Sequence, residues 1–167
     1  MNWMSFLTYA LITTFTPGPN NIMSLSNASR LGVRRTLPFT FGVFAGFSIV
    51  MLLSTLLSTA LYSVLPAIKT PMLFVGAAYL LYLAWKTFKS TGVQEESSLK
   101  SGFLSGLLLQ FINPKGIVYA IVSMETFIIP YYHGQTLALI GIALLMSALC
   151  LASTVSWAVF VSVFKLL

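Results

Sequence analysis

Charged side chains are scarce in this chain of 167 residues, and aspartate is absent from it. Lys, Arg and Glu together make up 7% of the residues, whereas a typical soluble domain carries about 25% charged residues. With so few charges the chain cannot cover a surface that faces water. Because 57% of the residues are hydrophobic, lipid is expected to surround most of the protein.

The shortage of reactive groups excludes several classes of function. A single cysteine, Cys150, cannot form an internal disulfide or a CxxC redox pair, which argues against a membrane thiol redox enzyme. The sequence has no metal-ligand cluster, no phosphate-binding glycine loop and no nucleophile paired with a base. The nine Lys and Arg outnumber three Glu but form no basic stripe. We therefore expect no enzymatic activity, no metal or cofactor, and no nucleic-acid partner.

Long apolar runs predict an all-α integral membrane protein with about five transmembrane helices in the lipid bilayer. The expected spans are residues 3–31, 37–62, 71–88, 102–124 and 136–161, with a polar connector at 89–100 and a short loop at 130–135. Each span is long enough to cross a hydrocarbon core about 30 Å thick, or nearly so.

The basic residues between the spans predict the orientation of the chain. Of the nine Lys and Arg, Lys115 lies within a span, Lys69 falls on one side of the membrane, and the other seven fall on the opposite side. The seven are Arg30, Arg34, Arg35, Lys86, Lys89, Lys100 and Lys165. Since cytoplasmic loops carry the excess of positive charge, the loop at 30–35 is expected in the cytoplasm. The N-terminus is then periplasmic, in a multi-pass protein of a bacterial inner membrane.

Two of the expected spans are interrupted by proline at similar depth in the membrane. The first break contains Thr16, Pro17, Gly18, Pro19, Asn20 and Asn21, and the second contains Asn113, Pro114 and Lys115. Proline removes an amide donor and frees an upstream carbonyl, and glycine between two prolines lets the chain turn. The alternative is that each proline only kinks its helix, as prolines in membrane helices often do.

The two breaks indicate an internal repeat. Pro17 and Pro114 lie 97 positions apart (114 − 17 = 97) and are separated by three spans, so the second copy must run in the opposite direction. A single membrane domain over residues 1–167 would thus contain a first repeat at 1–90 and a second at 101–167. The span at 71–88, shifted by 97, falls beyond Leu167, so an inverted three-plus-three repeat lacks its sixth helix here. Either the chain is truncated, or another subunit, such as a second copy in a homo-oligomer, completes the second half.

Glycines at a spacing of four residues predict two close helix contacts. Gly42 and Gly46 lie in the second span, and Gly102 and Gly106 begin the fourth. The GxxxG pattern lets membrane helices approach closely, so these glycines are expected to pack helices rather than to line a pocket.

Paired, interrupted helices in two inverted halves are typical of transporters with a binding site near the bilayer midplane. The freed carbonyls can face the ammonium group of an amino acid, and the new helix N-terminus at Asn20 can face its carboxylate. The expected substrate-binding residues are Thr16, Pro17, Gly18, Pro19, Asn20, Asn21, Asn113 and Lys115.

Lys115 is the most conspicuous of these residues, because a cation about midway through a span is costly unless it is paired or hydrated. One hypothesis is that Lys115 contacts the substrate carboxylate or carries a proton. The alternative is a structural lysine that binds the carbonyls released at Thr16 and Pro17. Titratable groups are few within the spans, so any coupling to protons is expected to run through Lys115 rather than through Glu125 at the rim.

Several segments of the chain resemble the LysE/RhtB family of amino-acid exporters. They are TPGPNN at 16–21, the glycines Gly32, Gly42 and Gly46, GAAYL at 76–80, and FINPK at 111–115. The resemblance implies export of a small neutral amino acid, such as cysteine or O-acetylserine, from cytoplasm to periplasm. It also implies six spans in a three-plus-three arrangement. The competing hypothesis is a truncated or non-transporting membrane bundle that acts as a subunit.

Overall fold

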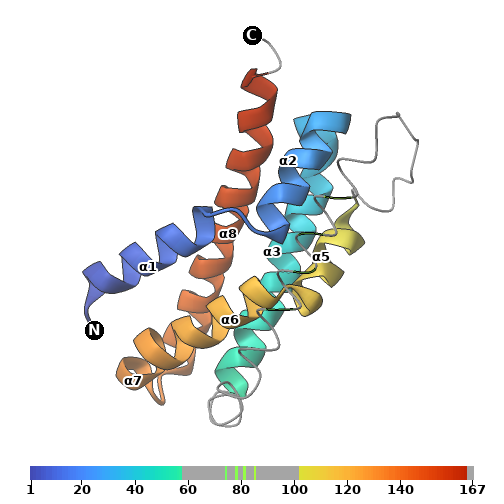
Figure 1. The fold of residues 1–167 in the computed structure, drawn as a ribbon. Coiled ribbons are helices and arrows are strands. Elements are labelled where there is room, and N and C mark those ends of the chain that lie inside the picture. The colour runs from blue at the N-terminus through green and yellow to red at the C-terminus, as the bar shows by residue number, and fades with distance from the viewer. Residues whose placement is uncertain (58–73, 75–77, 79–80, 82–84, 86–101, 165–167) are drawn as a thin grey trace.

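A computed structural model of the protein describes residues 1–57, 74, 78, 81, 85 and 102–164, and every regular element among them is helical (Figure 1). The expected third span at 71–88, apart from four single positions, and the connector at 89–100 lie outside the described residues. The elements are α1 (Trp3–Phe15), α2 (Pro19–Leu31), α3 (Val33–Leu56), α5 (Phe103–Ile112), α6 (Pro114–Val122), the π-helical turn η2 (Ser123–Ile128), α7 (Ile129–Tyr132) and α8 (Thr136–Phe164).

Two helices, α3 and α8, form the centre of the molecule and pack against each other. Among the described residues they are the two single helices long and apolar enough to cross a membrane, and a third span exists if the bent pair Phe103–Ile112 and Pro114–Tyr132 counts as one. At 1.5 Å per residue, the 24 residues of α3 extend about 36 Å. Large apolar side chains on their outer faces, such as Ile49 and Phe160, are exposed. An apolar exterior over this length fits a helical membrane protein.

The prediction that residues 3–31 form one interrupted transmembrane helix is confirmed for the interruption and not confirmed for the span. The break exists, but α1 has 13 residues and extends only about 20 Å. Most of the side chains that helix α2 buries are polar: Asn20, Asn21 and Ser24 are buried beside Pro19 and Ala28. The Ser24 hydroxyl donates to the Thr154 carbonyl of α8 at 2.6 Å. The count of five spans is therefore not confirmed over the described residues.

The second break is confirmed, but the helix after it does not end where the sequence predicted. The chain bends by 65° between Ile112 and Pro114. It then stays helical to Tyr132 instead of ending near Met124 with a loop from Pro130. The π-helical turn η2 explains the difference: the Ile129 amide donates to the Met124 carbonyl, and Pro130 falls in the first turn of α7.

The glycine motifs are confirmed as contacts between α3 and α5. A Cβ atom at Gly42 would collide with the Phe103 carbonyl, and a Cβ atom at Gly106 would collide with the Phe39 carbonyl. At Gly46 it would lie 2.9 Å from the Cγ atom of Gln110. This close approach of the two backbones brings Gln110 of α5 into the interior of the bundle.

Candidate functional site

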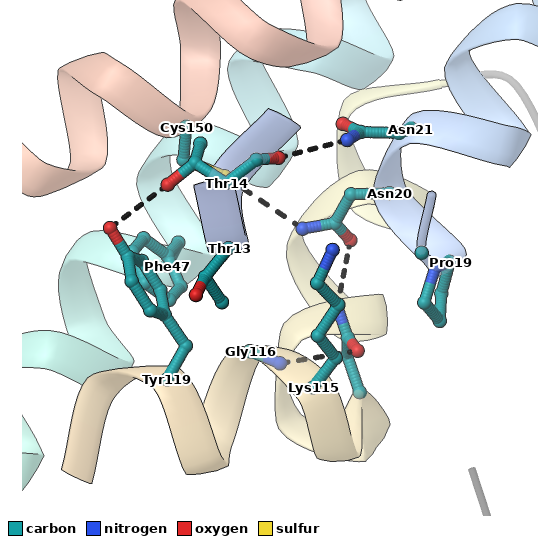
Figure 2. Close-up of a pocket in the computed structure, with 12 residues that line it drawn as sticks. Thr13, Thr14, Pro19, Asn20, Asn21, Phe47, Lys115, Gly116, Tyr119 and Cys150 are labelled. Atoms are coloured by element: carbon teal, nitrogen blue, oxygen red, sulfur yellow. Dashed lines mark hydrogen bonds between the residues drawn. The ribbon is translucent and has the colours of Figure 1, made fainter. Parts of the chain in front are cut away.

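The two helix breaks face each other at the centre of the molecule and enclose one polar pocket (Figures 1 and 2). The pocket has a volume of about 30 Å³, which is room for about two water molecules. Its lining residues are Thr13, Thr14, Gly18, Pro19, Asn20, Asn21, Phe47, Asn113, Lys115, Gly116, Tyr119 and Cys150. Six of the eight predicted site residues line this pocket, and the remaining two, Thr16 and Pro17, contact Lys115.

Three buried amide side chains join the two breaks. Asn20 and Gln110 exchange a reciprocal pair of hydrogen bonds, each 2.9 Å long. The Asn113 amide also donates to the Asn20 side-chain oxygen at 3.0 Å. The Asn113 oxygen in turn accepts from the Gly116 backbone amide at 3.3 Å and so caps the start of α6. Since Asn20 belongs to α2 and its partners to α5 and the second break, these bonds hold the two interrupted pairs together.

Asn21 and Ser153 donate hydrogen bonds to the carbonyls that have no helical partner at the end of α1. The Asn21 amide donates to the Thr14 carbonyl at 2.9 Å and to the Thr16 carbonyl at 3.0 Å. Ser153 of α8 lies within hydrogen-bond distance of the Thr14 carbonyl (2.9 Å) and of the Asn21 oxygen (3.3 Å). The last carbonyls of a helix lack intrahelical partners. Here side chains from α2 and α8 satisfy them, which keeps the break stable.

Lys115 reaches from the second break to the first. Its Nζ atom donates to the Thr16 carbonyl at 2.7 Å, to the Thr16 hydroxyl at 3.0 Å and to the Pro17 carbonyl at 3.4 Å. In the part of the chain that the structure describes, no carboxylate pairs with this ammonium group. The contacts are those of the structural alternative. A contact with the substrate carboxylate and a role as proton carrier remain predictions.

The sequence indicated that Gly18 lets the chain turn between two prolines, but the structure gives a different reason for glycine at this position. Its backbone is extended, with φ −166° and ψ 174°, a conformation open to any residue, so no left-handed turn is needed here. A Cβ atom at this position would instead lie 2.7 Å from the Cδ atom of Lys115. The missing side chain therefore gives Lys115 its path to the first break.

The opposite wall of the pocket is aromatic and was not predicted. The rings of Phe47 and Tyr119 stack with centroids 5.8 Å apart, and Thr14 donates a hydrogen bond of 2.9 Å to the Tyr119 hydroxyl. Cys150 of α8 closes the wall, with its sulfur 3.8 Å from the Asn20 amide nitrogen. Helical spacing could have indicated Tyr119, which lies four residues after Lys115 on the same face. Cys150 carries no such signal, because only the packing of α8 brings it to the site.

Two helices begin at the pocket and add to its electrostatic character. α2 starts at Pro19 with Gly18 as its N-cap, which offers no side-chain hydrogen bond to the first turn. α6 starts at Pro114 with Asn113 as its N-cap. A helix N-terminus carries partial positive charge and favours anions. Together with the Lys115 ammonium group, these two helix starts give the pocket a positive electrostatic character.

Interrupted helices that meet at a pocket inside an apolar bundle are a feature of many membrane transporters. The chain belongs to the LysE family, because the family model described as LysE type translocator matches residues 11–166. This result confirms the resemblance found in the sequence and the expectation of a transporter rather than an enzyme.

Bacterial efflux proteins are among the relatives of this chain. A cysteine/O-acetylserine efflux protein of Klebsiella pneumoniae is 39% identical over 155 residues, which cover 92% of this chain and 79% of the relative. The proteins of the same name from Salmonella typhimurium and from Escherichia coli O9:H4 are 41% and 38% identical, with the same coverage. No solved structure matches the chain. The relatives and the apolar helices support amino-acid export by a bacterial membrane protein.

Proposed function

We propose that this chain exports a small neutral amino acid, cysteine, O-acetylserine or a molecule of similar size, from the cytoplasm to the periplasm across the inner membrane. The observation that carries the proposal is the convergence of both helix breaks on one polar pocket, with Asn20, Asn113 and Lys115 joining them. The names of the relatives support the choice of solute.

The chemistry of the pocket suits the three parts of such a solute. The start of α2 and the charge of Lys115 favour a carboxylate. Carbonyl and amide oxygens around the first break favour an ammonium group, and the Phe47 and Tyr119 rings offer an apolar surface to a short side chain. Alternating access requires the two interrupted pairs to move relative to each other, so that the pocket opens to one side of the membrane at a time.

The order of elements supports the inverted repeat as part of this proposal. α1 and α5 end 97 positions apart (112 − 15 = 97), and in each half a break, a second helix and a long apolar span follow. In Figure 1, α1 and α6 extend to one side of the centre, and α2 and α5 extend to the other. The two copies thus run in opposite directions through the pocket. Such halves can exchange conformations to open the pocket to either side of the membrane.

Reconstitution tests the function directly. Proteoliposomes that contain the purified chain are loaded with labelled cysteine or O-acetylserine, and release is compared with that from protein-free liposomes. We expect release that saturates with internal substrate and that an excess of unlabelled substrate suppresses. Release equal to the protein-free background would contradict the proposal and favour a non-transporting bundle.

Lys115→Ala tests whether the pocket is the transport site. We expect the flux to fall about tenfold to a hundredfold, since charge-assisted hydrogen bonds contribute roughly 1.5–3 kcal/mol each. The matched control is Arg34→Ala, which removes an exposed cation far from the pocket. Both variants are compared at equal abundance in the membrane. Wild-type flux from Lys115→Ala would show that the solute passes elsewhere.

A further inference from the structure

The ammonium group of Lys115 lies in a shell of three oxygen atoms that all come from the first break. They are the Thr16 carbonyl, the Thr16 hydroxyl and the Pro17 carbonyl, at 2.7, 3.0 and 3.4 Å. The Thr16 hydroxyl donates its own proton to the Thr13 carbonyl at 2.9 Å, so toward Lys115 it can only accept. The shell is thus made of acceptors alone and recognises a cation that carries N–H donors.

The same shell matches the amino group of the proposed solute. A lysine ammonium and the α-ammonium of an amino acid are both primary, singly charged and equipped with three N–H donors. The helix is broken at Thr16 and Pro17, where no following helical turn supplies backbone amide donors to these oxygens. The Thr16 carbonyl also accepts from the Asn21 side-chain amide at 3.0 Å, and its second lone pair accepts from Lys115. No atom of the shell distinguishes the amino acid's ammonium from that of Lys115.

The lysine can leave the shell without a change in the backbone. Its side chain is half-buried and lines the pocket, and its four-carbon stem is flexible. It approaches the oxygens across Gly18, whose missing Cβ atom leaves the path open. A rotation of this stem would bring the ammonium group into the pocket, where the carboxylate of a bound solute would meet it (Figure 2).

We infer that the Thr16 and Pro17 oxygens form the subsite for the solute's ammonium group, and that Lys115 fills this subsite as a tethered competitor until the solute displaces it. The inference rests on the proposed function. On binding, the solute's ammonium takes the three oxygens, and the released Lys115 pairs with the solute's carboxylate. On release, Lys115 returns and expels the ammonium. A solute that carries only the ammonium or only the carboxylate group cannot replace all the hydrogen bonds that Lys115 loses when it leaves the shell. The exchange therefore selects α-amino acids, which carry both groups.

Binding of cysteamine, which is cysteine without its carboxylate, tests the exchange. The purified full chain is studied by equilibrium dialysis with labelled cysteamine under reducing conditions. We expect weak binding to the wild type and binding at least about tenfold tighter to Lys115→Ala, because charge-assisted hydrogen bonds of the lysine no longer have to be broken. Binding of 3-mercaptopropionate, which lacks the ammonium group, should weaken in the same variant. Arg34→Ala should bind both probes as the wild type does.

Gly18→Ala provides an independent variant that keeps the charge. The added Cβ atom would lie 2.7 Å from the Cδ atom and 3.1 Å from the Nζ atom of Lys115, so it should push the side chain out of the shell. We expect tighter cysteamine binding here as well. This variant also decides the question if Lys115→Ala does not fold.

The outcomes separate the exchange from the function. One outcome is that wild-type proteoliposomes release cysteine while cysteamine binds Lys115→Ala and Gly18→Ala no more tightly than it binds the wild type. This result would contradict the displacement of Lys115 by the solute and would leave the proposed export supported. If the wild type neither releases cysteine nor binds it, both fall. Tighter cysteamine binding in both variants, with wild-type cysteine release, supports the exchange.

Discussion

Buried amide side chains organise the pocket at the scale of single residues. Asn20 donates to and accepts from Gln110 and also accepts from Asn113, and all three side chains are buried. A buried polar group without a partner costs about 1–3 kcal/mol. Neutral amides satisfy one another in pairs and add no charge to a site where, among the described residues, no carboxylate pairs with Lys115.

Gln110→Ala should destabilise the protein. The change leaves the side chain of Asn20 without the reciprocal partner that it has at 2.9 Å, in a place where Gln110 itself is fully buried. We expect a loss of about 2 kcal/mol in the free energy of unfolding. Thermal unfolding of the purified protein in detergent measures the effect. The control is Gln135→Ala, which truncates an exposed glutamine outside the bundle; equal midpoints for the two variants would refute a structural role for the amide pair.

At the scale of elements, each break is stabilised by side chains from other helices. The carbonyls at the end of α1 accept hydrogen bonds from Asn21 of α2, Lys115 of α6, and Ser153 and Trp157 of α8. Proline explains why the helix stops at residues 16–18. The donors from three other helices explain why the freed carbonyls remain satisfied inside an apolar bundle.

Gly42→Ala should separate α3 from α5. A Cβ atom at Gly42 would collide with the backbone carbonyl of Phe103, and backbone cannot rotate away as a side chain can. Overpacking of this kind costs about 1–3 kcal/mol, and the shift would also move Gln110 away from Asn20. We expect a lower thermal midpoint and reduced flux.

Gly141→Ala is the matched control for that prediction. Gly141 lies within α8, and no atom of the described chain lies within 4 Å of an added Cβ. Alanine has a higher helix propensity than glycine, so this variant should be as stable as the wild type or slightly more so. Equal destabilisation by both changes would mean that the contact between α3 and α5 is not what requires Gly42.

At the scale of the whole molecule, the charge distribution makes a prediction about orientation. The turn between α2 and α3 lies at one end of the bundle, and the turn before α8 lies at the other (Figure 1). Because Arg30, Arg34 and Arg35 surround the first turn, it should face the cytoplasm. In a Cys150→Ser background, Leu31→Cys should resist a membrane-impermeant thiol reagent in intact cells, and Gln135→Cys should react.

The interpretation of the labelling needs one control. Both cysteine variants are also treated after the cells are opened, where each should react, since Leu31 and Gln135 are exposed. If only Leu31→Cys reacts in intact cells, the turn between α2 and α3 faces the periplasm, and the orientation predicted from the positive charges is wrong.

Local properties of the sequence were sufficient for the class of protein and for the location of the breaks. Hydropathy over about 20 residues predicts α3 and α8 as spans. Pro17 and Pro114 predict the breaks because the missing amide acts on the helix that contains it. The eight predicted site residues all lie at these two breaks, which the sequence located. The LysE family match agrees with the motifs that contain these residues.

The tertiary structure alone decided which surfaces meet. Helix α2 has too little apolar character for a span. Its Asn20 and Asn21 are buried because α5, α8 and the second break supply partners that lie 90 or more positions away. The same holds for Cys150, which reaches the pocket only through the packing of α8. The three oxygens around Lys115 also depend on contact between the two breaks. A periodic pattern describes one helix and its faces, whereas a binding pocket depends on how several helices are placed against one another.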